Sequence, residues 1–138
     1  MGHKLAIGDA PGEMPPPATD IGGKAIQLAA GGAFSCALLD TGKVRCWGRI
    51  EHLGIGMSGA SIGDEPGEMP PPEAALGGVA VKLAFAGAGS NHMCAVMNDA
   101  KLRCWGLAFG CGLGLPLEQT GGWFGDSELP TSLGPVPY

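Results

Sequence analysis

The sequence has little charge, few aromatic residues and no long uninterrupted apolar run. Only 15% of its 138 residues are charged, and its eight lysines and arginines are scattered along a chain of net charge −5. A nucleic-acid surface needs clustered cations that release counterions from phosphates, so the sequence argues against nucleic-acid binding. The longest apolar stretches are broken by polar residues and glycines, so no membrane-spanning helix is expected.

The chain also lacks the residue patterns of common catalytic sites. It has no C-x-x-C zinc knuckle, and no nucleophile stands in a recognisable order with a base and an acid. The glycine-rich stretch 110–114 lacks the helix and the acidic partner of a dinucleotide-binding turn. The sequence therefore predicts a protein that is not an enzyme and that needs no cofactor.

Residues 1–9 show neither a signal peptide nor a myristoylation signal. The only indication of compartment comes from the cysteines, which recur at equal spacing in two pairs. Paired cysteines mildly favour an oxidising, lumenal or extracellular compartment, because disulfides persist there.

Glycine and proline, by contrast, are abundant, with 26 and 12 residues, and they recur in two halves of the chain. IGDAPGEMPPP at 7–17 returns as IGDEPGEMPPP at 62–72, a shift of 55 residues. SCALLDTGKVRCWG at 35–48 returns as MCAVMNDAKLRCWG at 93–106, a shift of 58. Three extra residues are therefore expected in a loop near 87–91.

We divide the chain into repeat unit 1 (1–61), repeat unit 2 (62–123) and the degenerate start of a third repeat (124–138). Short strands separated by glycine-rich turns at this period are typical of β-propeller blades. The predicted fold is therefore all-β, with antiparallel propeller-type blades that form an incomplete ring of two blades and part of a third.

Within each unit the alternation predicts a first strand, at 25–30 and 79–84, followed by a hairpin. Asp40-Thr41-Gly42 suits a three-residue turn that places Cys36 opposite Cys46. The same register places Cys94 opposite Cys104, although Ala100 replaces the turn glycine.

These four cysteines are candidates for two structural disulfides. Zinc ligation and reduced, buried thiols are the alternatives. Cys111 is left over. It is a tolerated small residue in a turn, a free thiol or the partner of a cysteine in another molecule, and we favour the first.

Several short motifs resemble the repeats of the regulator-of-chromosome-condensation family, in a cysteine-bearing variety. They are CALL at 36–39, VRCWG at 44–48, LGIG at 53–56 and LRCWG at 102–106. The resemblance implies four-stranded antiparallel blades, usually about seven to a ring. Trp47 and Trp105 stand at the same point of each repeat, so we favour packing between blades over an aromatic binding surface for them. The founding member promotes nucleotide exchange on a small GTPase and binds chromatin, but no motif here carries either activity.

Two blades and a stub leave strand edges open on both sides. We therefore expect a noncatalytic structural or docking subunit of a larger protein assembly, whose edges are covered by further repeats, identical copies or other subunits. Trp123 lies outside the regular pattern, and Trp123 and Phe124 are candidates for partner contact.

Two alternative functions remain open from the sequence. The first is an extracellular recognition protein supported by disulfides or by calcium in the acidic loops 9–13 and 64–68. The simpler interpretation of these loops, which we favour, is a Pro-Gly turn without a bound ion. The second alternative is a small-GTPase nucleotide exchange factor.

Overall fold

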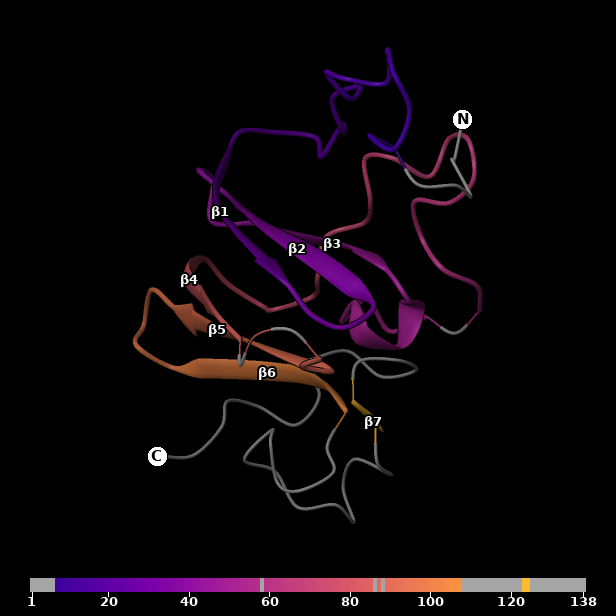
Figure 1. The fold of residues 1–138 in the computed structure, drawn as a ribbon. Coiled ribbons are helices and arrows are strands. Elements are labelled where there is room, and N and C mark those ends of the chain that lie inside the picture. The colour runs from indigo at the N-terminus through magenta and orange to yellow at the C-terminus, as the bar shows by residue number, and fades with distance from the viewer. Residues whose placement is uncertain (1–6, 58, 86, 88, 108–122, 125–138) are drawn as a thin grey trace.

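The computed structural model describes residues 7–57, 59–85, 87, 89–107 and the backbone of 123–124. The described part consists of two antiparallel sheets and one short 3-10 helix (Figure 1). The first sheet has the order β1-β2-β3 and the second β4-β5-β6-β7, which confirms the predicted all-β fold class. The element bounds are β1 (Ala25–Ala30), β2 (Phe34–Leu39), β3 (Val44–Gly48), η1 (Ile50–His52), β4 (Ala80–Ala84), β5 (His92–Met97), β6 (Leu102–Leu107) and β7 (Trp123–Phe124).

The hairpin registers follow the turn chemistry. Cys36 pairs with Cys46 across β2 and β3, and Cys94 pairs with Cys104 across β5 and β6, as predicted. Gly42 closes the first turn at φ +79°, whereas Ala100 closes the second at φ +64°, a left-handed conformation that is unfavourable for alanine. The repeated register therefore survives the loss of the turn glycine.

The loop between β4 and β5 holds the extra residues of the second unit. It spans 85–91, whereas its counterpart between β1 and β2 spans only 31–33. The Gly32 N–H donates to the carbonyl of Ser90 over 2.9 Å. The longer loop of unit 2 thus lies against the shorter loop of unit 1. Its extra length falls in the region near 87–91 where the sequence predicted the insertion.

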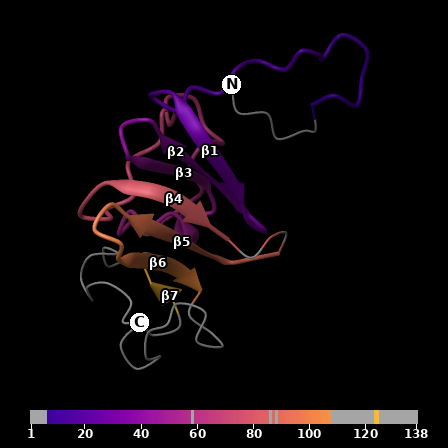
Figure 2. The same ribbon diagram turned by 90° about the vertical axis from the view of Figure 1, so that its left-hand side faces the viewer.

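The two sheets lie side by side, and the main core is between them (Figure 2). Leu38 and Val44 of the first sheet and Leu83 and Met93 of the second belong to one buried cluster. The Gln27 side chain joins the sheets through its Nε2, which donates to the Leu83 carbonyl, and its Oε1, which accepts from the Leu83 N–H, both at 2.8 Å. The two units therefore form one packed structure.

The start of each later repeat adds to the preceding sheet. Ile62 pairs with Gly48 at the end of β3, and Phe124 pairs with Gly106 at the end of β6. Ile62 and Phe124 occupy the same place in the repeated sequence, before Gly-Asp. This equivalence supports the proposed unit starts at 62 and 124. No helix among the described residues is long and apolar enough to cross a membrane.

Candidate functional site

Each sheet has two faces, because side chains alternate along a strand. We call the face with Leu28, Ser35 and Trp47 the back face of unit 1, and its counterpart with Leu83, Met93 and Trp105 the back face of unit 2. The front faces hold Cys36, Leu38 and Val44 in unit 1, and Cys94, Val96 and Leu102 in unit 2. The front face of unit 1 and the back face of unit 2 are the two faces that meet, because their residues share one buried cluster.

Unit 1 buries Leu83, Met93 and Trp105 on the back face of unit 2, whereas Arg103 on the same face is half-buried. The Trp105 side chain is 0% exposed and lies against Gly54, where an added Cβ would come within 2.8 Å of the indole Cδ1. Leu83 is 1% exposed and Met93 is 0% exposed. Trp105 therefore packs between the two units, at a place where only glycine leaves room for the indole.

The back face of unit 1 is open. Leu28 is 65% exposed, although it occupies the position of the buried Leu83. Trp47 and Ser35 are only partly buried, unlike Trp105 and Met93. Leu28, Ser35 and Trp47 line a largely apolar hollow of about 220 Å³. The repeat thus has an apolar face that one unit buries and the other exposes.

The segments that precede the two first strands show the same contrast. Pro71 is buried, and its carbonyl accepts a hydrogen bond from Arg45 Nη1 on β3. Its counterpart Pro16 is exposed, and the segment that carries it runs away from the sheets (Figure 2). The segment of unit 2 is therefore fixed on unit 1, while the segment of unit 1 has no sheet beside it among the described residues.

Glu73 extends the contact between the units by ion pairs to Lys43, just before β3, and to Arg45 on β3. Its Oε1 lies 2.7 Å from Lys43 Nζ and 3.3 Å from Arg45 Nη2. The counterpart of Arg45 in unit 2 is Arg103, whose Nη1 is buried and finds no hydrogen-bond partner within the part of the chain that the structure describes. Arg103 lines a hollow of about 70 Å³ beside Gly77.

The acidic loops bind their own backbone. Glu68 Oε2 accepts from the N–H groups of Gly63, Asp64 and Glu65 at 2.8, 3.1 and 3.0 Å, and Glu13 does the same in unit 1. Hydrogen bonds from the Glu65 and Gly63 N–H groups hold the pKa of Glu68 below its ordinary value. Three converging N–H groups favour an anion and repel a cation, so the arrangement supports the turn interpretation over calcium.

His52 is a buried polar residue that sequence reasoning missed. It is 2% exposed, stacks on Phe34 with ring centroids 5.1 Å apart, and contacts the Asn91 carbonyl through Nδ1 at 3.0 Å. Burial lowers the pKa of its imidazole, although the Asn91 carbonyl acts in the opposite direction. No local sequence signal marks this position, because the carbonyl that His52 contacts belongs to Asn91 of unit 2.

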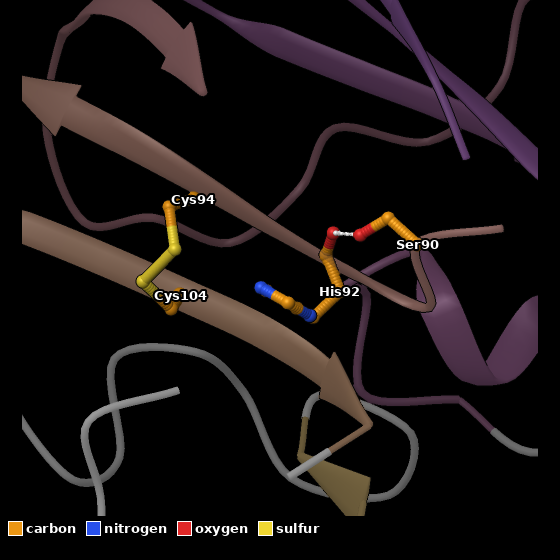
Figure 3. Close-up of a disulfide and its surroundings, with 4 residues drawn as sticks. All are labelled: Ser90, His92, Cys94 and Cys104. Atoms are coloured by element: carbon orange, nitrogen blue, oxygen red, sulfur yellow. Dashed lines mark hydrogen bonds between the residues drawn. A yellow bond between two sulfur atoms is a disulfide. The ribbon is translucent and has the colours of Figure 1, made fainter. Parts of the chain in front are cut away.

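The paired cysteines face each other across their hairpins. The structure joins Cys36 to Cys46 and Cys94 to Cys104, each with Cα atoms 4.1 Å apart. His92 lies on the same strand as Cys94, and its carbonyl accepts from Ser90 Oγ (Figure 3). With its sulfur in a disulfide, Cys94 is not a nucleophile that His92 could activate.

The remaining residues predicted from the sequence lie wholly or partly outside the described ranges. Cys111 and most of the expected third repeat lie outside the described residues, and only the backbone of Trp123 and Phe124 is described. Within the described ranges, no group of three or more His, Cys, Asp and Glu side chains is placed to hold a metal ion.

Comparisons with known proteins agree with this architecture. A family model described as "Regulator of chromosome condensation (RCC1) repeat" matches residues 25–49. The chain is 32% identical over 117 residues to the RCC1 domain-containing protein RUG3, mitochondrial, of Arabidopsis thaliana. This match covers 83% of the chain and 25% of that relative, so the chain spans about a quarter of the relative's length.

Two solved structures of yeast proteins share the fold. Yeast RCC1 (Prp20) bound to Kap60 is 20% identical, with a TM-score of 0.58 over 88% of this chain and 26% of that one. Prp20p from Saccharomyces cerevisiae, described with its binding to Gsp1p and histones, is 19% identical, with a TM-score of 0.58 over 88% and 27%. The repeat match and the Arabidopsis relative place the chain among the proteins with RCC1 repeats, and the two solved structures show that it shares their β-propeller fold.

Proposed function

We propose that this chain is a noncatalytic protein-interaction module that docks into a larger protein assembly through the back face of unit 1. The observation that carries the proposal is the contrast between Leu28, 65% exposed, and Leu83, 1% exposed, at one position of the repeat. A residue that unit 2 buries under a neighbouring blade is left open in unit 1, together with Trp47.

The physical argument rests on the apolar character of that face. Burying an exposed leucine side chain stabilises a complex by about 1.5 to 3 kcal/mol, and indoles are enriched among the residues that dominate interfaces. A sheet with an open edge beside such a face is also disposed to accept a neighbouring strand. The solved relatives are described with protein partners, Kap60 in one case and Gsp1p and histones in the other, which supports a role in protein binding.

Trp123 and Phe124 are further candidates for contact with a partner. Their backbone pairs with β6, at the opposite end of the two sheets from β1. We propose that they contribute to docking at that end, where the ring of blades is also incomplete.

The test is the native mass of the tagged chain in extracts of the cells that produce it. We expect a species far heavier than the 13.8 kDa of the free chain, and we expect Leu28→Lys to return it to that mass. Ile26→Lys is the matched control, because Ile26 is 59% exposed on the same strand and its counterpart Val81 is also exposed, at 53%. A wild-type chain that runs at its own mass contradicts the proposal.

A further inference from the structure

The open face at one end of the molecule resembles the face of unit 2 that unit 1 covers, and the face at the other end resembles the face of unit 1 that covers it. Unit 1 covers the back face of unit 2 with its own front face, where Cys36, Leu38 and Val44 are at most 1% exposed. Their counterparts in unit 2, namely Cys94, Val96 and Leu102, are only partly buried. The chain therefore has an open back face at one end and an incompletely covered front face at the other.

Resting on the proposed docking function, we propose that the partner on the back face of unit 1 is a second copy of this chain, which binds head to tail through the front face of its unit 2. The contact between units 1 and 2 is the template, because both surfaces of the proposed interface are counterparts of surfaces already packed together. An interface that joins two different patches is heterologous, and it builds a ring or a filament.

The exposed proline segment of unit 1 fits the other end of the molecule. Pro70 lies beside Gly22 and Arg45, within 3.1 Å of a Cβ placed on Gly22, and Pro71 accepts from Arg45. In unit 2 the corresponding place, beside Gly77 and Arg103, is a hollow of about 70 Å³.

A second copy would fill that hollow with its own prolines. Pro15 and Pro16 are the counterparts of Pro70 and Pro71, and both are exposed. The Pro16 carbonyl would accept from Arg103 Nη1, which is buried and has no hydrogen-bond partner among the described residues. A buried unpaired donor is unfavourable, so this contact adds to the driving force.

One part of the template is already occupied. Phe124 takes the place beside Gly106 that Ile62 takes beside Gly48. The counterpart of Ile62 in a second copy, Ile7, therefore does not pair there, and the proposed contact begins at Pro15.

Lys82 makes the proposed contact between copies weaker than the contact between units 1 and 2. It is the counterpart of Gln27, whose amide both donates to and accepts from the backbone of Leu83. A lysine ammonium has three donors and no acceptor, so Lys82 of one copy can bond the Leu28 carbonyl of the next but not its N–H. Replacing Lys82 by Gln restores the second hydrogen bond, which tightens association by about threefold to tenfold.

The first test is sedimentation velocity of the purified 138-residue chain over a range of concentrations. We expect the average mass to rise above 13.8 kDa with concentration, and to rise at lower concentration for Lys82→Gln. Leu28→Lys removes the association, whereas the equally charged control Ile26→Lys keeps it. A wild-type chain that stays at 13.8 kDa at every concentration overturns the second copy as partner, even if the same chain is heavy in cell extracts.

The second test distinguishes head-to-tail binding from a symmetric contact. Leu28→Lys blocks the back face of unit 1, and Val96→Lys blocks the front face of unit 2, so each variant alone is monomeric. Mixed in equal amounts they keep one intact surface of each kind, and we expect a dimer that grows no further. Circular dichroism checks that both variants fold, and Leu102→Ser replaces Val96→Lys if it does not. Folded variants that stay monomeric when mixed contradict the proposal.

Discussion

Residues at equivalent positions of the two units have different environments, and this difference carries the functional argument. Leu28 has the same side chain as its counterpart Leu83, and Trp47 the same as Trp105. The residue type therefore does not indicate which member of each pair is buried. What separates them is a neighbouring unit, which covers one and not the other. Sequence reasoning could predict that the tryptophans pack between blades, but it could not predict that, among the described residues, a neighbouring unit covers Trp105 and leaves Trp47 partly exposed.

Gly54 tests the contact between the units at a single residue. Gly54→Ala places a Cβ about 3 Å from the Trp105 indole, at φ +68°, so we expect a lower free energy of unfolding. Gly67→Ala is the matched control, because Gly67 has a similar φ of +91° and no atom near its added Cβ. Urea denaturation should show Gly54→Ala to be less stable than Gly67→Ala by about 1 to 3 kcal/mol. Equal stabilities would mean that Trp105 does not pack against Gly54.

His52 makes stability depend on pH. Burial lowers its pKa in the folded state below the unfolded value of about 6.5, so the unfolded state takes up the proton first as the pH falls. Stability is therefore full above pH 6.5 and declines as the pH falls through the folded pKa. We expect the urea midpoint to drop between pH 7 and pH 5, and the drop to be smaller in His52→Gln. If the urea midpoint of His52→Gln falls with pH as much as that of the wild type, another group causes the pH dependence.

At the scale of elements, the strands and hairpins follow from local chemistry. The first strand of unit 1 begins and ends at the predicted residues, and the first strand of unit 2 begins one residue later than predicted. Both hairpins adopt the register that their three-residue turns require, even where Ala100 replaces glycine. Turn geometry and alternation are short-range properties, which is why the sequence was sufficient for them.

The cysteine pairs give a prediction at this scale. If both disulfides form, titration of the unfolded, unreduced protein with a thiol reagent gives one free thiol from the five cysteines. Each bridge closes a loop of ten-residue separation and should stabilise the fold by about 2 to 3 kcal/mol, which denaturation with and without reductant measures. Five free thiols in protein purified without reductant would contradict the pairing and favour reduced, buried cysteines.

At the scale of the whole molecule, the number of units determines the surface that remains open. The sequence predicted an incomplete ring with exposed edges, but it could not predict how the open area divides between strand edges and an apolar face. The structure adds the back face of unit 1, the exposed proline segment beside it and the partly buried front face of unit 2. These depend on contacts more than fifty residues apart in the sequence, such as the one between Gln27 and Leu83.

Amide hydrogen exchange of β1 tests the central claim most directly. The Leu83 N–H is bonded to Gln27, whereas no described residue of the chain offers a side chain to the Leu28 N–H. We predict fast exchange at Leu28 and slow exchange at Leu83 in the dilute chain. When the back face of unit 1 binds its partner, β1 is shielded from water, so exchange at Leu28 slows even though Lys82 offers no acceptor to its N–H, and exchange at Leu83 stays unchanged. Exchange at Leu28 that is equally fast in the free and the assembled protein would contradict the account.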